Sequence, residues 1–553
     1  MQLLTRAHEA LVVVAACAVL YFTGLGDIPF HTRGEPREGL VVREMLRTGQ
    51  WLVPARPDGE PARKPPLYYW SAATALASLP EPPERALRLP SALFATAAVL
   101  GVWATARALW GAAAGLPAAL VLATSFEWTR AATSARVDMT LAAALTAALA
   151  GCMLALAGRG RAAPVLAAAG VTLGALAKGP VAPVLTALAI LALRLVRHDV
   201  RRLHPLAVLA AATAVAAAWY GVALLREGNA FLDVVARENL FRFVDPETGR
   251  TGHAHGTWYL LPLGLVGVLP WTPLLPLALV PLRERPRPPA VAFAAAWLVV
   301  GFVFFSLAAA KRSVYLLPLH PALALLVGAG VASATDGRPE RTARLGAALY
   351  APVAVVVAAL AAALALGLDP TAPLHPLLRP ADAAGAAALA ASARATWLVV
   401  LAAGTALAVP VVARAARGGA WRRLVVVVAT LFVVWTAAFD ARLRPAIARE
   451  GSLRAFLVHV REIVPADAPL YAIFPPDPGL RFYAGPDLRR WPSRGAPADG
   501  YLLLWEDEWR RFRDPAGRPL SVLAVSDARQ GSRGHLALVA PPQGPLRTGS
   551  RRP

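Results

Sequence analysis

The residues best suited to chemistry gather in one loop, 27–66, which follows the first apolar segment of the chain. Glu35, Arg37 and Lys64 lie in it, between apolar segments and therefore at the edge of a bilayer. Charged groups at that depth are costly unless they pair with one another or meet a ligand, which makes them site candidates. A compact lysine ammonium on a flexible stem suits a phosphate, so we expect Lys64 to bind one.

Lysine is rare in this chain, and its positions are a second signal. Of 56 basic residues only three are lysine, Lys64, Lys178 and Lys311, and the others are arginine. All three fall at the same predicted membrane boundary. The alternative is that the three lysines cluster on one side by chance. For Lys178, a further alternative is that it anchors a turn at the lipid head groups. We favour a functional role because arginine does not automatically replace lysine at a phosphate.

The composition indicates a membrane protein. The 553 residues are 57% hydrophobic and 16% charged, with a mean hydropathy of +0.51, whereas soluble proteins are about 45–50% apolar and about 25% charged. Apolar runs of about 18 residues are long enough to cross a bilayer of about 30 Å. Thirteen spans are predicted, at 10–26, 87–110, 112–126, 138–158, 162–177, 180–197, 205–225, 257–282, 289–309, 314–334, 345–368, 396–414 and 421–439.

Arginines predict the orientation, because they concentrate in alternate short loops between these spans. The positive-inside rule assigns such loops, and with them the N-terminus, to the cytoplasm. The long loops 27–86, 226–256 and 369–395, and everything after residue 440, are then expected outside.

The formal net charge of +22 does not predict a nucleic-acid partner. Much of it lies in the inside loops, and no basic stripe interleaved with aromatic residues occurs. Anionic head groups of membrane lipids are the expected partners. Cys17 and Cys152 both lie within spans, so they predict neither a disulfide framework nor a thiolate metal site.

Two domains are predicted, a transmembrane domain over 1–440 that includes the loop 27–86, and an outside domain over 441–553. In the second, 452–464 has the pattern of a helix with Ser452 as its cap. Short apolar runs bounded by Pro, Gly and Asp predict strands at 468–474, 501–505, 521–525 and 536–539. We expect a small α/β domain.

The order of residues in the first loop resembles a known family. It keeps Glu35 and Arg37, followed by Glu44-Met45-Leu46, Gly49-x-Trp51-x-x-Pro54 and Lys64-Pro65-Pro66-Leu67. This order resembles the first outer loop of the family 39 glycosyltransferases of the GT-C superfamily, which include protein O-mannosyltransferases and lipid A aminoarabinose transferases. The chain departs from the family at Gly34, where an Asp is usual, and at Glu38, where an aromatic residue is common.

The resemblance implies a polytopic GT-C fold and an enzyme of the bacterial inner membrane, with its active site on the periplasmic side. The implied reaction is inverting transfer of a sugar from a polyprenyl-phosphate donor to a lipid or protein acceptor. Such transfer needs a carboxylate at the acceptor and cations at the departing phosphate. Glu35 and Asp138 are the predicted catalytic carboxylates. The alternative role of Glu35 is an ion pair with Arg33 or Arg37. The alternative role of Asp138 is to cap a helix N-terminus.

The predicted donor-binding residues come from three segments of the chain. Arg37 and Lys64 lie in the first loop. Lys311, Arg312 and Tyr315 resemble a later Lys/Arg-x-x-Tyr-x-x-Pro segment of the family, with a lipid-facing anchor as the alternative. The loop 226–256 resembles family segments with Glu-Asn-x-x-Arg and His followed by Trp-Tyr, which adds the candidates Arg242, His253 and His255.

No cofactor is predicted. The pair His253 and His255 could bind zinc with Glu35 or Asp138, but two imidazoles alone are weak support for a metal. The chain has no phosphate-cradling Gly-rich loop, so a nucleotide sugar is not the expected donor.

Two other functions compete with transfer. A transporter or flippase of polyprenyl-linked sugars would place charges at the bilayer midplane, in broken helices and inverted repeats. Here the charges gather at the outer rim, which favours catalysis. A scaffold for the outside domain would leave the loop motif unexplained. The sequence leaves lipid A, another glycolipid and protein Ser/Thr as possible acceptors.

Overall fold

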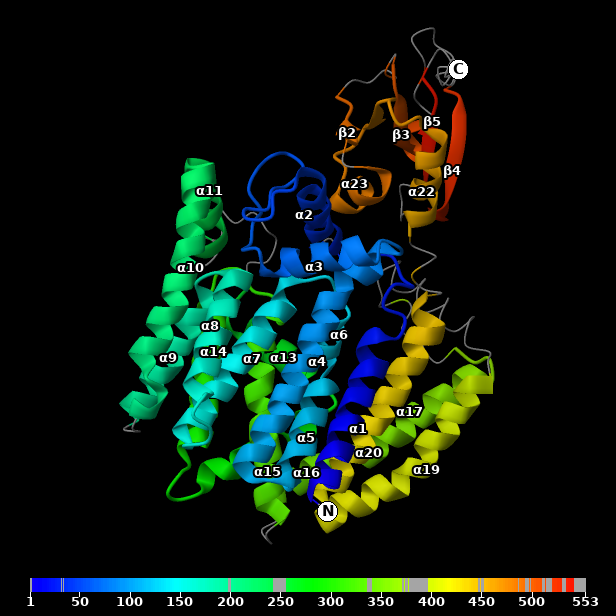
Figure 1. The fold of residues 1–553 in the computed structure, drawn as a ribbon. Coiled ribbons are helices and arrows are strands. Elements are labelled where there is room, and N and C mark those ends of the chain that lie inside the picture. The colour runs from blue at the N-terminus through cyan, green and yellow to red at the C-terminus, as the bar shows by residue number, and fades with distance from the viewer. Residues whose placement is uncertain are drawn as a thin grey trace.

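The computed structural model describes residues 2–541 apart from 31, 33, 197–199, 242–254, 336–340, 370–371, 373–375, 377–395, 446–447, 449–451, 486, 493–496, 498, 510–512, 514–519 and 530–533. Its long helices form one bundle (Figure 1). Two shorter helices, α2 (Gly34–Thr48) and α3 (Leu67–Ser78), lie at one end of the bundle, and a small β-sheet lies beyond them. We call this end the sheet end; α1 begins at the opposite end.

The bundle helices alternate in direction along the chain, apart from the two that share the single apolar stretch Ala343–Ala365. They are α1 (Gln2–Phe22), α4 (Pro83–Trp110), α5 (Ala112–Ala123), α7 (Val137–Leu156), α8 (Ala163–Lys178), α9 (Val181–Leu195), α10 (Pro205–Glu227), α13 (Leu260–Gly267), α14 (Pro289–Leu307), α15 (His320–Thr335), α16 (Arg341–Ala348), α17 (Tyr350–Ala365), α19 (Thr396–Gly418) and α20 (Trp421–Ala438). Short segments connect them, among them α6 (Phe126–Ala132), α11 (Asn229–Val235), η2 (Ala236–Phe241), η4 (Thr272–Leu279) and η6 (Ser313–Leu319).

Apolar helical structure is present at each of the thirteen predicted spans, but not every one is a single helix of spanning length. Within the described part of the chain, nine helices are long and apolar enough to cross a membrane. A further pair, Thr257–Gly267 and Thr272–Arg283, is bent by 101°, and three shorter apolar helices are α5, α8 and α9. The predicted fold class, a helical multi-span membrane protein with a small α/β part, is confirmed.

Close helix contacts depend on small residues, as is usual where lipid tails surround a bundle. A Cβ atom at Gly151 of α7 would lie 2.4 Å from the backbone nitrogen of Ala167, and one at Gly170 of α8 would lie 2.3 Å from that of Ala148. Only glycine therefore allows α7 and α8 to approach this closely. Their approach fixes how the end of one helix meets the start of the other.

The helix predicted within the first loop is present as α2. Its apolar residues Leu40, Val41 and Met45 are buried against α3 and the start of α4. Gly49 ends the helix with φ +70°, a left-handed conformation that favours glycine.

The C-terminal part forms a five-stranded sheet in the order β2-β1-β3-β5-β4. The strands are β1 (Leu470–Ala472), β2 (Arg489–Arg490), β3 (Tyr501–Trp505), β4 (Val522–Arg529) and β5 (His535–Val539). β1 pairs in parallel with β2 and β3, and β5 pairs antiparallel with β3 and β4. The helix α22 (Arg454–Ile463) buries Phe456, Leu457 and Val460 against it. Four strands and this helix were predicted, and β2 was not. Ser452, the predicted N-cap, accepts a hydrogen bond from the Arg454 amide. The N-cap position of α22 is occupied by Leu453.

A short helix, α23 (Pro478–Ala484), joins this α/β part to α2. The ring of Phe482 is fully buried, and a Cβ atom at Gly39 of α2 would lie 2.8 Å from it. The Arg43 guanidinium lies 3.5 Å from the centroid of the same ring, which is a cation–π contact. Tyr483 donates a hydrogen bond to Glu84 of α4 at 2.6 Å. These contacts hold α23 against both α2 and α4.

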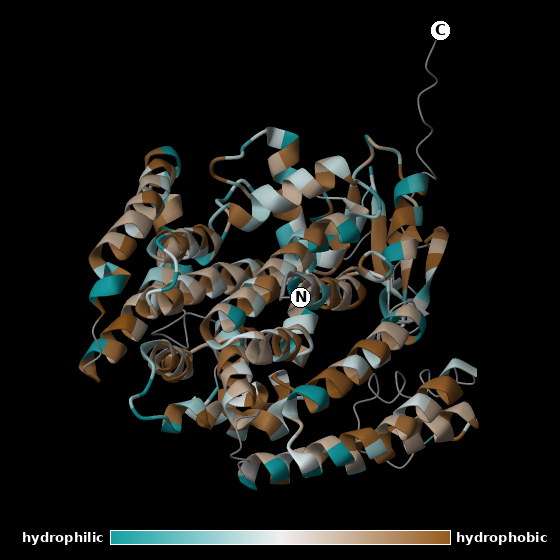
Figure 2. Ribbon diagram, turned by 60° about the horizontal axis from the view of Figure 1, so that its bottom comes forward, coloured by the Kyte–Doolittle hydropathy of each residue, from teal (hydrophilic) through white to brown (hydrophobic). Residues whose placement is uncertain are grey.

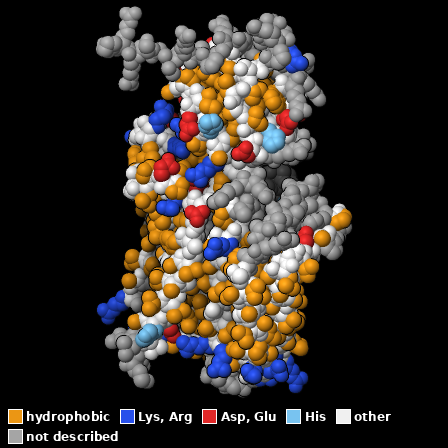
Figure 3. All heavy atoms as spheres, turned by 90° about the vertical axis from the view of Figure 1, so that its right-hand side faces the viewer, with side chains coloured by type: hydrophobic (Ala, Val, Ile, Leu, Met, Phe, Trp, Pro, Cys, Tyr) orange, Lys and Arg blue, Asp and Glu red, His pale blue; other side chains and the backbone are white. Residues whose placement is uncertain are grey.

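The surface agrees with a membrane environment. Hydrophobic residues dominate the bundle helices (Figure 2), and on one face they cover the wall of the bundle while Lys and Arg gather at its lower end (Figure 3). At that end Arg417 lies in the last turn of α19, and Arg422 and Arg423 lie in the first turn of α20.

The close packing of α7 and α8 generates a stability prediction. Gly170→Ala should lower the thermal midpoint of the detergent-solubilised protein, because overpacking at a backbone contact costs about 1–3 kcal/mol. The matched control is Gly404→Ala in the apolar helix α19, where a Cβ atom would meet nothing within 4 Å. An equal midpoint for the two variants would contradict this packing.

Candidate active site

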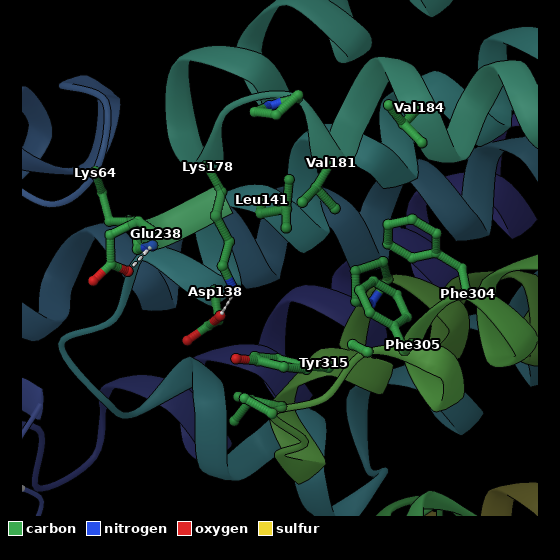
Figure 4. Close-up of a pocket in the computed structure, with 15 residues that line it drawn as sticks. Lys64, Asp138, Leu141, Lys178, Val181, Val184, Glu238, Phe304, Phe305 and Tyr315 are labelled. Carbon is green, nitrogen blue, oxygen red and sulfur yellow. Dashed lines mark hydrogen bonds and ion pairs between the residues drawn. The ribbon is translucent and has the colours of Figure 1, made fainter. Parts of the chain in front are cut away.

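A cavity of about 260 Å³ lies at the sheet end of the bundle, among α7, α8, α9, α14 and η6 (Figure 4). We call it the apolar cavity, since most of its wall is hydrophobic: Leu141, Pro180, Val181, Val184, Phe304, Phe305, Ala308, Ala310, Val314 and Pro318. Its remaining lining residues are charged or polar: Lys64, Asp138, Lys178, Glu238 and Tyr315.

A smaller space of about 50 Å³ adjoins it, which we call the polar hollow. Its lining residues are Gly34, Arg37, Glu38, Lys64, Arg136, Val137, Asp138, Lys178, Arg312 and Tyr315. Four of them, Lys64, Asp138, Lys178 and Tyr315, also line the apolar cavity. The two spaces are therefore neighbouring parts of one site, a charged part against an apolar part.

Helix geometry brings Asp138 and Lys178 together. Asp138 is the second residue of α7, and Lys178 is the last residue of α8. Because these helices pack closely and run in opposite directions, the start of one meets the end of the other. A carboxylate in the first turn and an ammonium in the last turn are also the charges that the helix dipoles favour.

The two side chains form an ion pair inside the site. Each is 17% exposed, so the pair is shielded from bulk water on most sides. The Lys178 ammonium also lies 4.8 Å from the centroid of the Tyr315 ring, within reach of a cation–π interaction. Lys178 is thus held between a carboxylate and an aromatic face.

A second ion pair joins the first loop to η2. Lys64 donates a hydrogen bond to Glu238 with 2.7 Å between the ammonium nitrogen and a carboxylate oxygen. The side chains are 13% and 12% exposed. Arg63 reaches the other oxygen of Glu238 at 3.9 Å. An anion that binds Lys64 must therefore compete with this carboxylate.

A third group is formed by Arg37, Glu38 and Tyr69. Arg37 donates two hydrogen bonds to one oxygen of Glu38, at 2.6 and 3.1 Å. Tyr69 donates to the other oxygen at 2.6 Å. Glu38 raises the pKa of the Arg37 guanidinium, and burial raises the pKa of the Tyr69 phenol, so the donors stay protonated.

Two more arginines complete the polar hollow. Arg136 directly precedes α7, and Arg312 directly precedes η6. Burial lowers the pKa of the Arg136 guanidinium, which still leaves it charged at neutral pH. The hollow is lined by more cations than carboxylates, namely Arg37, Lys64, Arg136, Lys178 and Arg312 against Glu38 and Asp138. Such a balance suits a phosphate.

Glu35 lies outside both spaces and is fully buried. One of its oxygens accepts hydrogen bonds from Arg88 of α4 at 2.8 Å and from the Ala135 amide at 3.1 Å. Glu35 thus pairs with a buried arginine that is distant in sequence, and it does not line the hollow in which it was expected to act.

Some of the predicted donor-binding residues line the polar hollow, and others do not. Arg312 and Tyr315 line the hollow, as do Arg37 and Lys64. Lys311 is buried beside it, where its ammonium donates to the carbonyl oxygens of His255 at 2.8 Å and of Ala308 at 2.6 Å.

The histidine segment gives no support to a metal centre. The ring of His255 stacks on Tyr259 with 3.7 Å between centroids. Arg242 and His253 lie outside the described residues. Over the described ranges, no three His, Cys, Asp or Glu side chains are grouped so that they could hold a metal ion.

Four charged lining residues were not among the predicted site residues: Glu38, Arg136, Lys178 and Glu238. The rarity of lysine was a usable signal for Lys178, and Arg136 lies two residues before the predicted Asp138. Glu38 was visible as a departure from the family pattern. Glu238 stands at the Glu of the Glu-Asn-x-x-Arg pattern, from which only Arg242 was taken as a candidate, and its contact with Lys64 spans 174 residues.

Comparison with known sequences places the chain near lipid-phosphate sugar transferases. The family model described as dolichyl-phosphate-mannose-protein mannosyltransferase matches residues 63–221. An undecaprenyl phosphate-alpha-4-amino-4-deoxy-L-arabinose arabinosyl transferase of Aeromonas salmonicida is 34% identical over 30% of this chain and 30% of its own length. The Pectobacterium carotovorum protein of that name is 28% identical over 65% of this chain and 66% of its own length. The alignments thus span from under a third to about two thirds of these relatives.

Solved structures extend the similarity to the whole fold. ArnT from Cupriavidus metallidurans bound to undecaprenyl phosphate superposes with a TM-score of 0.75 at 22% identity, covering 96% of this chain and 97% of that one. The archaeal oligosaccharyltransferase AglB from Archaeoglobus fulgidus, in complex with an inhibitory peptide and a dolichol-phosphate, reaches a TM-score of 0.50 at 13% identity and covers 90% and 69%.

The position of Glu35 generates a prediction. Glu35→Gln should destabilise the protein by about 3–5 kcal/mol, because it leaves the Arg88 cation buried without its counter-charge. The control is Glu44→Gln on the same helix, whose partner Arg47 is 68% exposed, and it should cost at most about 1 kcal/mol. Thermal melting in detergent measures both. A Glu35→Gln protein that melts like the wild type would contradict a purely structural role.

Proposed function

We propose that this chain, which has the fold of the GT-C glycosyltransferases, is an integral-membrane glycosyltransferase with a polyprenyl-phosphate-linked sugar as its donor. The sugar passes to an acceptor at the sheet end of the bundle. The predicted resemblance to family 39 agrees with the relatives named above, which are themselves sugar transferases.

One observation carries the proposal, the junction of the polar hollow with the apolar cavity. An amphiphile with a phosphate and a prenyl tail matches this pair of spaces. Its phosphate meets Lys64, Lys178 and Arg37, and the first units of its tail lie against Phe304 and Phe305. A water-soluble nucleotide sugar has no part that fits the apolar cavity.

The chemistry follows from this placement. The acceptor oxygen attacks the anomeric carbon from the side opposite the phosphate, the bond from that carbon to the phosphate oxygen breaks, and its electron pair leaves with the phosphate. The configuration of the sugar inverts. The cations of the hollow stabilise the phosphate as its negative charge grows, and preorganised charges of this kind are typically the largest contribution to catalysis.

Asp138 orients Lys178 in this scheme. Its carboxylate holds the ammonium at the junction of the two spaces, where the phosphate is expected. A loss of this carboxylate would release the ammonium toward the Tyr315 ring and alter the position of the phosphate.

The orientation is part of the proposal. Arginines gather at the end of the bundle opposite the site, and the positive-inside rule assigns that end to the cytoplasm. The site then faces the periplasm in a bacterial inner membrane. The acceptor is a lipid or a protein that reaches the membrane from that side.

The transporter alternative has less support. The charged residues of the site lie at one end of the bundle and none of the lining residues named above marks a passage through it. The relatives reported above are named as transferases, not as carriers.

The direct test of the function is a transfer assay. Purified protein in lipid nanodiscs is incubated with labelled polyprenyl-phosphate sugars and bacterial membrane extract, and label is followed from the donor to a new product. Release of lipid phosphate with a labelled product supports the proposal. Movement of intact donor across a sealed bilayer, without a new product, would replace it with the transporter.

Lys64 generates a quantitative prediction. Lys64→Ala should slow transfer about 30- to 1,000-fold, since a point charge lost from a partly dry site costs about 2–4 kcal/mol in the transition state. Lys64→Arg should rescue only in part because the guanidinium has another shape. The initial rate of lipid phosphate release measures both. An unchanged rate in Lys64→Ala would remove this residue from the site.

Neutralising Glu238 should strengthen donor binding, whereas removing Lys64 should weaken the interaction with the donor. Because its carboxylate competes with the donor phosphate for Lys64, Glu238→Gln should tighten the binding of polyprenyl phosphate about 3- to 10-fold, or about 1 kcal/mol. The control is Glu60→Gln, whose partner is Arg56 and which lines neither space. Weaker binding in Glu238→Gln would show that the carboxylate supports the donor instead.

A further inference from the structure

We infer that Glu38 is the carboxylate that contacts the acceptor and takes its proton, in place of Glu35. This inference rests on the proposed transfer reaction and adds to it a catalytic residue of this particular chain. It starts from the carboxylates near the site, each of which has a different set of partners.

Three of these carboxylates are unsuited to the role. Glu35 is fully buried outside the hollow, where it accepts hydrogen bonds from Arg88 and the Ala135 amide. Asp138 is ion-paired with Lys178, the cation at the junction. Glu238 lines the apolar cavity but not the polar hollow. Of the described carboxylates, Glu38 alone lines the hollow without being paired to a lysine.

Glu38 is held in a defined direction. Tyr69, itself fully buried, donates to one carboxylate oxygen at 2.6 Å and fixes it to α3. The other oxygen faces Arg37, whose side chain is 37% exposed and so has room to move. A donor phosphate attracts the same guanidinium. As Arg37 turns toward the phosphate, this oxygen of Glu38 loses its cation and becomes available to the acceptor.

Space for the acceptor lies one helical turn away. Gly34 and Glu38 are four residues apart in α2, so they share one side of the helix, and both line the hollow. Among the described residues, a Cβ atom at Gly34 would have the Thr32 hydroxyl as its one neighbour within 4 Å, at 3.9 Å. The absence of a side chain there leaves the hollow open beside the Glu38 carboxylate, where an acceptor hydroxyl can enter.

The proton balance of the step is then complete. As the acceptor oxygen bonds to the anomeric carbon, its proton passes to the freed oxygen of Glu38, and the phosphate leaves with the electron pair of the broken bond. The protonated Glu38 afterwards gives its proton to water. Donor binding and activation of the base are coupled through Arg37, which disfavours transfer when no phosphate is bound.

The test compares Glu38→Gln with Glu44→Gln, a carboxylate on the same helix that lines neither space. Glu38→Gln should lower kcat about 10²- to 10⁴-fold, the range for loss of a general base. Its affinity for polyprenyl phosphate should not fall below that of the wild type, because Arg37 is released from a competing carboxylate, and Glu44→Gln should keep the wild-type kcat. A wild-type kcat in Glu38→Gln overturns the inference.

A double variant keeps the test decisive if Glu38→Gln folds poorly. Gly34→Asp places a carboxylate one turn away on the same side, in open space, so Gly34→Asp/Glu38→Gln should regain at least tenfold in kcat over Glu38→Gln. Failure of this rescue in a protein that melts like the wild type overturns the inference. If instead the wild type transfers no sugar from any polyprenyl-phosphate donor, the proposed function itself fails.

Discussion

The buried guanidinium of Arg88 is the interaction on which the rest of the site depends. It is 1% exposed and donates to the Glu35 carboxylate and to the carbonyl oxygens of Leu25, Ile28 and Pro29. One side chain of α4 thereby fixes both the turn after α1 and the first turn of α2. A cation buried to this degree requires such a full set of acceptors. Because the contact sets the start of α2, it also sets where Arg37 and Glu38 lie.

The site is built from charges that are already paired. Lys64 pairs with Glu238, Lys178 with Asp138, and Arg37 with Glu38. At a membrane edge, a paired charge costs less free energy than an unpaired one. In the proposed function, an arriving phosphate would exchange one anionic partner for another instead of meeting bare cations. This exchange explains how a strongly cationic hollow can exist beside an apolar cavity, and why donor binding can change the state of a carboxylate.

Hydropathy was sufficient to locate the apolar helices of the bundle, because each depends on the composition of one local segment. The α2 helix and its end at Gly49 were also local and therefore predictable. The first loop motif and the scarcity of lysine both pointed to Lys64, which lines both spaces. Which carboxylate of the first loop faces the hollow was not predictable from the sequence. Glu35 and Glu38 are three residues apart and lie on nearly the same side of the helix, so helix periodicity does not distinguish them. The contact of Glu35 with Arg88, 53 residues later in the chain, is the observation that leads us to propose Glu38 instead.

The same limit applies to Lys178 and Glu238. Lys178 meets Asp138 only because glycines let α7 and α8 pack closely, and Glu238 meets Lys64 across 174 residues. Neither contact has a signature within a window of sequence. The predicted sheet is an intermediate case, since four of its strands were visible as apolar runs while β2, with the sequence Arg489–Arg490, carries no apolar residue.

The central claim is that one lipid phosphate occupies both spaces, and a structure of the protein in nanodiscs with polyprenyl phosphate tests it most directly. The account predicts phosphate density between Lys64, Lys178 and Arg37, Glu238 displaced from Lys64, and the first prenyl units against Phe304 and Phe305. Prenyl density confined to the separate apolar groove lined by Leu265 and Phe302, with the Lys64–Glu238 pair intact, would contradict it.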